Sequence, residues 1–159
     1  MHTGYISSRF SWYEVEHSQT AERLGIDNTV PDALVAAVEN TAVNMEFIRT
    51  LIANPVLVDS WYRGPELQKL PEFYNPTSQH PKGEAVDFIA PKFGSPLEIC
   101  KLILQHADII KFDQLILEHT WVHISFASGP GALQRKQVLS LLANKKYAPG
   151  LTNPYGVAL

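Results

Sequence analysis

Four ionisable side chains whose chemistry suits a metal site stand in two short segments of the sequence. His80 and Asp87 belong to "SQHPKGEAVDF", and Glu118 and His123 belong to "ILEHTWVHISF". Two imidazoles and one carboxylate leave a fourth position open on a tetrahedral zinc ion, which is the ligand set of a catalytic site. A further carboxylate beside such a site can accept a proton from water. An interior ion-pair network between Asp87 and a histidine is the alternative interpretation.

A predicted β-hairpin explains how Glu118 and His123 would meet. Residues 112–118 and 121–126 are strand-like, and a two-residue turn joins them. In that register Glu118 pairs with Trp121 and becomes a diagonal neighbour of His123 on one face. The turn would be His119-Thr120, the polar face would carry Gln114, Ile116, Glu118, Trp121, His123 and Ser125, and the core face would carry Leu115, Leu117, Val122, Ile124 and Phe126.

Asp87 stands in the middle of another predicted strand, residues 84–90. Alternate residues of that strand are apolar and would face the core. A carboxylate in mid-strand is unfavourable unless it is paired or bound to a metal. His80 precedes Asp87 by seven positions, and Gly83 between them allows a bend that folds His80 back toward the strand.

The elements that hold these strands begin with helices. Residues 1–54 are predicted to be helical, with short helices capped by Ser11 and Ser18. A longer helix would have Pro31 at its first position and end near residue 54. Further along, Ser95 opens a capping box that starts another helix.

Residues 55–159 supply the sheet and the active site. Residues 56–62 form a further predicted strand, residues 63–83 a long loop with one helical turn, and residues 134–142 fit either a strand or a helix. Helices followed by strands that are close together in the sequence predict an α+β fold with a small antiparallel sheet and helices packed on one face. The whole chain, residues 1–159, is expected to be one domain.

Composition excludes several classes of protein. The net charge of −3, with no cluster of lysine and arginine, argues against nucleic-acid binding. The single cysteine, Cys100, excludes an internal disulfide and a multi-cysteine zinc site. The N-terminus lacks the pattern of a signal peptide, and no apolar run approaches the roughly 20 residues that span a bilayer. We therefore expect a monomer, made in the cytoplasm, with no stable membrane association.

Four segments resemble one known family. "SQHPKGEAVDF" resembles the Ser-x-His-x-x-Gly-x-Ala-x-Asp motif of the zinc D-Ala-D-Ala carboxypeptidases and their relatives, which include the vancomycin-resistance dipeptidases, the phage L-alanyl-D-glutamate endopeptidases and the hedgehog signalling domain. "WVHISF" resembles the second motif, an aromatic residue followed closely by the last zinc-binding histidine. "DSWYRGPEL" resembles the strand end "SGYRS", whose arginine binds substrate. "FSWYEVEHSQTAERLGIDNTVP" resembles the opening of the phage and prophage branch.

The resemblance implies a role for each matched residue. It implies one Zn²⁺ ion per chain, held by His80, Asp87 and His123. Glu118 would be the catalytic base, and Arg63 would grip a carboxylate or carbonyl oxygen of the substrate, which suits its planar guanidinium. The resemblance also implies a hedgehog and D-Ala-D-Ala peptidase-like fold.

Three further residues would complete the substrate site. Ser78 matches the serine of the first motif and would bond beside the ligands or to substrate. Trp121 would form a wall of the groove, and His119 would help Arg63 to hold oxyanion charge. The alternative, purely structural interpretations are a core position for Trp121, an exposed turn position for His119 and an ordinary surface ion pair for Arg63.

The chain departs from the family pattern in three places. Thr120 occupies the position, three residues before the last histidine, where the family often has its carboxylate, so the role of Glu118 depends on the hairpin register. Trp61 replaces the glycine of "SGYR", and the loop that leads to His80 lacks the usual double glycine. Glu84 is the alternative base, although we expect it to be solvated at a strand edge.

These observations predict a zinc metallopeptidase that hydrolyses peptide bonds in peptidoglycan stem peptides. It would be a phage or prophage endolysin-type endopeptidase or a D,D-carboxypeptidase, and would act on the cell wall after delivery from the cytoplasm or as part of a virion. A zinc-retaining, non-catalytic wall-binding or virion module is the alternative. An iron oxygenase with two histidines and one carboxylate would place its first two ligands two positions apart, and a zinc deaminase would need paired cysteines that this chain lacks.

Overall fold

The first two helices form where their capping residues stand. A computed structural model describes residues 1–159 of the chain. Helix α1 (Trp12–Glu16) is capped by Ser11, and α2 (Gln19–Leu24) is capped by Ser18. Both caps are the ones that the sequence predicts, because the side-chain oxygens accept hydrogen bonds from free N–H groups of the first turn.

The longest helix begins later than predicted. Pro31 leads into a 3₁₀ turn, η1 (Asp32–Leu34), before α3 (Val35–Ile52) begins. Helix α3 ends where Ala53 takes a left-handed φ of 53°. No helix of the structure is both long enough and apolar enough to cross a membrane.

Six strands form one sheet in the order β1-β2-β4-β3-β5-β6. They are β1 (Leu57–Ser60), β2 (Ala85–Ile89), β3 (Gln114–Leu117), β4 (Val122–Ser125), β5 (Gln137–Leu141) and β6 (Tyr147–Pro149). The α+β class is confirmed, but the sheet is mixed. Four neighbouring pairs are antiparallel, whereas β3 and β5 are parallel. The sheet is thus mostly antiparallel, as expected, and the β3–β5 pair is parallel because the chain crosses back after β4 and enters β5 in the direction of β3.

The β3–β4 hairpin has the predicted register. Leu117 pairs with Val122, and Ile116 pairs with His123. The N–H of Glu118 donates to the carbonyl of Trp121 at 3.1 Å, which extends the ladder by one pair beyond the strands. Glu118 and His123 therefore share one face of the hairpin, as the alternation predicts.

The long loop before β2 contains two short helical turns. One is α4 (Pro65–Gln68), the single turn that the sequence predicts, and the other is η2 (His80–Lys82). Gly83 ends η2 with a φ of 72°, and a Cβ atom there would collide with the side chain of Val38 on α3. Only glycine meets both demands, so the bend that returns His80 to β2 depends on Gly83.

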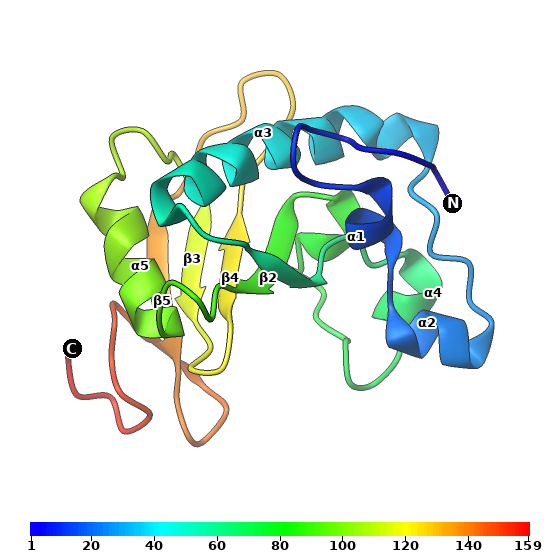
Figure 1. Cartoon of the computed structure of the whole chain (residues 1–159). Coiled ribbons are helices and arrows are strands. Elements are labelled where there is room, and N and C mark those ends of the chain that lie inside the picture. Colours follow the sequence, from blue (N-terminus) through cyan, green and yellow to red (C-terminus); the bar gives the residue numbers. More distant parts are fainter.

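One face of the sheet is covered by α3 and by α5 (Pro96–Gln105), which starts at the predicted capping box of Ser95. Figure 1 shows α1, α2 and α4 gathered at the β2 end of the sheet, with α5 toward β3 and β5. Side chains of the core include Val38, Ala42, Met45, Ile48, Ile52, Val86, Phe88, Ile99, Ile103, Leu115, Leu117, Val122, Ile124 and Phe126. The other face carries the polar side chains of the strands.

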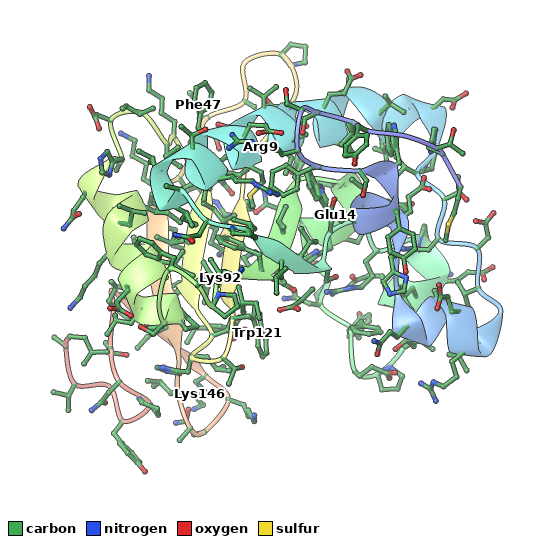
Figure 2. The ribbon with its side chains drawn as sticks, viewed as in Figure 1. Arg9, Glu14, Phe47, Lys92, Trp121 and Lys146 are labelled. Carbon is green, nitrogen blue, oxygen red and sulfur yellow. The ribbon has the colours of Figure 1, made fainter.

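The segment before α1 is tied to α3 by Arg9. Its Nε lies 2.6 Å from a carboxylate oxygen of Glu46, and its Nη2 donates to the hydroxyl of Thr50 at 2.7 Å. Figure 2 shows Arg9 against this helix. The contact joins the N-terminal segment to α3.

Candidate metal centre

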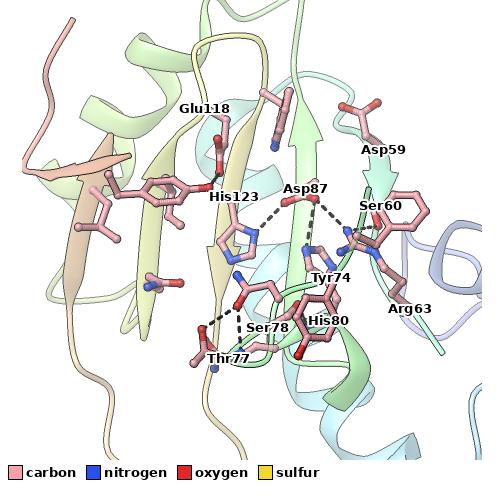
Figure 3. A pocket seen from close by; sticks show the side chains of 18 of the residues that line it. Asp59, Ser60, Arg63, Tyr74, Thr77, Ser78, His80, Asp87, Glu118 and His123 are labelled. Atoms are coloured by element: carbon pink, nitrogen blue, oxygen red, sulfur yellow. Dashed lines mark hydrogen bonds and ion pairs between the residues drawn. The ribbon is translucent and has the colours of Figure 1, made fainter. Parts of the chain in front are cut away.

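His80, Asp87 and His123 meet on the polar face of the sheet. Asp87 lies in the middle of β2 and is the register partner of His123 on β4. His80 opens η2, and the turn at Gly83 brings it back over β2. The three residues each offer a ligand atom, and these atoms all lie within 4.8 Å of one another. Figure 3 shows the three side chains converging between the strands.

His80 is held with one ring nitrogen facing the centre. Its Nδ1 lies 2.7 Å from the main-chain carbonyl oxygen of Trp61, and its Nε2 lies 3.2 Å from Oδ2 of Asp87. A histidine that donates from one nitrogen to a carbonyl keeps the other nitrogen as its lone-pair donor, as metal ligands in proteins commonly do. The hydroxyl of Ser78 accepts weakly from the main-chain N–H of His80 at 3.4 Å.

His123 approaches the other carboxylate oxygen of Asp87. Its Nδ1 lies 2.8 Å from Oδ1 of Asp87, and its ring stands edge-on to the ring of His80 with centroids 5.2 Å apart. The three side chains are 4%, 14% and 13% exposed for His80, Asp87 and His123. The cluster is thus largely shielded from water but remains open on one side.

The protonation states of this cluster suit a cation. Burial alone would raise the pKa of Asp87, but the charge and hydrogen bonds of His80 and His123 outweigh it and hold that pKa far below its usual value. Burial lowers the pKa of His80, opposed in part by Asp87. An ionised carboxylate and a neutral imidazole are the forms that bind a metal. The donor set therefore fits a metal ion, and His80, Asp87 and His123 could hold one.

Glu118 stands beside the cluster, just after the end of β3. It is 8% exposed, and its Oε1 accepts a hydrogen bond from the hydroxyl of Tyr147 at 3.0 Å. Burial raises the pKa of Glu118 above its usual value, while the Tyr147 hydrogen bond opposes that change. A carboxylate whose pKa is raised accepts a proton more readily than an ordinary carboxylate.

Arg63 forms the opposite wall. Its Nη2 lies 3.6 Å from Oδ2 of Asp87 and donates to the hydroxyl of Ser60 at 3.2 Å. Its guanidinium also stacks over the ring of Phe73, 4.7 Å from the ring centroid, and reaches Gln68 at 3.4 Å. Figure 3 shows Arg63 pointing toward Asp87 from the end of β1. These contacts hold the guanidinium of Arg63 at the edge of the His-Asp-His group.

A cleft of about 740 Å³ joins these groups. Its lining includes the three ligand candidates together with Arg63, Ser78, Glu118, Trp121 and Tyr147. The structure therefore brings Ser78 and Trp121 to the same cleft. His119 does not line it. The residue takes a left-handed φ of 64° in the turn, and its Nε2 lies 2.7 Å from the carbonyl oxygen of Leu141, so its ring is turned toward β5.

A polar network that includes the buried side chains of Asp113, Gln79 and Glu84 supports the turn that carries His80. Arg135 bonds both carboxylate oxygens of Asp113 and donates to Oε1 of Gln79 at 3.2 Å. Gln79 in turn donates to Glu84 at 3.2 Å, and Glu84 accepts from the N–H and hydroxyl of Ser128. Glu84 is 7% exposed, so the prediction that it is solvated is wrong. Both of its oxygens are engaged in this network, which leaves it poorly placed to act as a base.

Tyr147 is the residue of the site that the sequence did not indicate. It lies on β6, a three-residue strand that ends in a proline, and short strands of this kind give little periodic signal. The segment "ANKKYAP" does carry a turn signature between β5 and β6, and Lys145 there has a φ of 65°. That signature could have placed Tyr147 opposite the end of β5.

No family model matches the chain, and no curated protein matches it. Inferences about the chemistry of this chain therefore rest on the geometry of its own side chains. That geometry supports a largely buried His-Asp-His group that could hold a metal ion, next to the buried carboxylate of Glu118 and the partly buried guanidinium of Arg63.

Proposed function

We propose that the protein is a zinc-dependent peptidase that hydrolyses peptide bonds in the stem peptides of peptidoglycan. The observation that carries this proposal is the His80, Asp87 and His123 group with Glu118 beside it in one cleft. The ligand set is that of a catalytic zinc site rather than a structural one. The motifs that resemble the zinc D-Ala-D-Ala carboxypeptidases place their ligand residues at these same three positions.

The metal chemistry follows from the donor set. Two imidazole nitrogens and one carboxylate oxygen would hold the ion and leave a position for substrate or water. When bound, zinc supplies Lewis-acid polarisation of a carbonyl group and makes water more acidic. The hydrogen bond from His80 to the carbonyl of Trp61 would fix the ligand ring in its orientation.

Glu118 would move the proton in the reaction. Its carboxylate takes a proton from the attacking water, the oxygen of that water bonds to the peptide carbonyl carbon, and the carbon–nitrogen bond breaks. The proton then passes from Glu118 to the leaving amine, so the carboxylate is regenerated. Burial raises the pKa of Glu118, which makes its carboxylate a stronger base than an exposed one.

Arg63 would bind the substrate. Its guanidinium lies next to Asp87 and is oriented by Ser60 and Phe73, so a carboxylate or carbonyl oxygen of a peptide could approach it while the scissile bond lies over the cluster. Stem peptides of peptidoglycan present such carboxylates. A host cell wall would then be the site of action, reached by a lysis enzyme or a virion-associated one.

The test is mass spectrometry of purified peptidoglycan after incubation with the zinc-loaded protein. We expect new peptide ends from the wild type and a roughly 10²–10⁴-fold slower reaction from Glu118→Gln. The matched control is Glu72→Gln, because Glu72 is an exposed carboxylate that lines the same cleft. It should cleave at close to the wild-type rate.

Each other outcome has a clear meaning. Equal rates for Glu118→Gln and the wild type would remove Glu118 as the base. Zinc binding without products from any wall fragment would contradict the peptidase and favour a non-catalytic wall-binding module. The identity of the products separates the two kinds of peptidase, since a carboxypeptidase releases only a terminal D-alanine.

A further inference from the structure

The hydroxyl of Tyr147 makes the one hydrogen bond that the structure gives the Glu118 carboxylate. It donates to Oε1 at 3.0 Å, and Oε2 has no hydrogen-bond partner. Tyr147 lies on β6, which pairs with β5 at Leu141. It therefore approaches Glu118 from the β6 edge of the sheet. Figure 3 marks the hydrogen bond at Glu118 with a dashed line.

We propose that Tyr147 is the positioning residue that holds the Glu118 carboxylate with Oε1 engaged and Oε2 free for proton transfer. This inference rests on the proposed function, in which Glu118 is the base. A carboxylate that can rotate presents either oxygen in many directions, whereas a single fixed donor leaves one oxygen in one place. By binding Oε1, the tyrosine hydroxyl leaves Oε2 as the oxygen that transfers the proton.

Tyr147 has the properties that this role requires. Burial and the neighbouring Glu118 carboxylate raise its pKa above the usual value of a tyrosine, so the hydroxyl keeps its proton and remains a donor. The residue lines the same cleft as the metal cluster while remaining 49% exposed. Its hydroxyl thus reaches the buried carboxylate without Tyr147 being part of the hydrophobic core.

The charges that surround Glu118 come from three elements. His119 lies in the adjoining turn, His123 lies on β4 and Asp87 lies on β2. The two imidazoles favour the ionised form of Glu118 and Asp87 opposes it, while Tyr147 supplies the hydrogen bond to the ionised form. Removal of the hydroxyl should therefore raise the pKa at which Glu118 ionises.

The first test compares the pH–rate profiles of Tyr147→Phe and wild type on a wall peptide. We expect kcat at pH 7 to fall about tenfold, the size expected for a lost hydrogen bond to a charged group, with little change in KM. The acid limb of the profile should move to higher pH. Tyr155→Phe is the matched control, because Tyr155 is 84% exposed and its hydroxyl makes no hydrogen bond in the structure.

A double-mutant cycle then asks whether Tyr147 acts through Glu118. In the Glu118→Gln background, Tyr147→Phe should cause less than about a twofold further loss, because the residue to be positioned is gone. A full tenfold loss in that background would overturn the proposal. A pH–rate profile whose acid limb does not move although kcat falls would also overturn the proposal, because it would show that Tyr147 has only a structural role.

A third readout does not depend on turnover. Carbon NMR of the side-chain carboxyl of Glu118 in the zinc-loaded protein gives its ionisation midpoint directly. We expect a higher midpoint in Tyr147→Phe and an unchanged one in Tyr155→Phe. If no wall peptide is cleaved, the proposed function fails, while this titration still decides the inference. An equal midpoint in all three proteins would overturn it.

Discussion

Nδ1 of His80 lies 2.7 Å from the main-chain carbonyl oxygen of Trp61. A carbonyl only accepts, so the imidazole donates from Nδ1, and its Nε2 faces Asp87 with a lone pair that could bind a metal. The side chain of Trp61 is buried edge-on against Phe10 and does not line the cleft. Trp61 stands where the resembled motif has glycine, and its position shows that this departure adds no bulk to the cleft.

Gly83 should be difficult to replace. Gly83→Ala would place a Cβ atom at a φ of 72° and against Val38, so we expect the free energy of unfolding to fall by about 2–4 kcal/mol from backbone strain and overpacking together. Gly25→Ala is the matched control, because Gly25 has a φ of 67° with open space around it. Gly25→Ala should lower the free energy of unfolding by about 1–2 kcal/mol.

Urea unfolding of the two glycine variants measures this difference. Similar losses for both would contradict the account, because they would show that the contact with Val38 adds nothing to the backbone strain. The zinc content of Gly83→Ala should also fall, since His80 depends on the same bend.

Arg63→Lys should weaken substrate binding more than it weakens the fold. The change keeps the charge but removes the planar fork that contacts Ser60 and stacks on Phe73, so we expect KM to rise about tenfold. Kinetics on a wall peptide, with thermal unfolding in parallel, make the test. Arg23→Lys on the exposed side of α2 is the control. An unchanged KM for Arg63→Lys would show that Arg63 does not bind substrate.

The ion pair of Asp113 with Arg135 should stabilise the fold in a pH-dependent way. Burial alone would raise the pKa of Asp113, but the hydrogen bonds and charge of Arg135 outweigh it and lower that pKa. The contribution is therefore complete above the unfolded pKa of about 3.9 and is lost as the pH falls through the lower folded value. The measured quantity is the difference in unfolding free energy between wild type and Asp113→Asn.

We expect that difference to be constant from about pH 7 to pH 5 and to shrink below about pH 4. Urea unfolding at several pH values measures it. Asp108→Asn is the control, because Asp108 is exposed and has no ion-pair partner. It should show no such change. A difference for Asp113→Asn that grows in acid would contradict the assigned direction of the pKa shift.

Local patterns were enough to predict the register of the hairpin that carries Glu118 and His123. The alternation of Leu115, Leu117, Val122 and Ile124 fixes which face of the hairpin is buried, and that choice fixes the register that brings Glu118 beside His123. Caps at Ser11, Ser18 and Ser95 likewise mark three helix starts through contacts within one turn.

Contacts between distant segments could not be predicted in the same way. The parallel pairing of β3 with β5 joins strands separated by a hairpin and a loop, and no local pattern encodes it. Tyr147 reaches Glu118 through that pairing, so the turn signature before β6 could place Tyr147 beside β5 but could not reveal its contact with Glu118. The burial of Glu84 depends on Gln79 and Ser128, which lie on two different loops.

Zinc stoichiometry tests the central claim most directly. The protein would be stripped with a chelator, reloaded, dialysed and measured by plasma mass spectrometry, beside Asp87→Ala and Glu118→Gln. We predict about one zinc ion per chain in the wild type and in Glu118→Gln, and less than about a tenth of that in Asp87→Ala, which lacks the carboxylate between His80 and His123. Wild-type protein that binds no zinc, or Asp87→Ala that binds as much as the wild type, would contradict the metal centre.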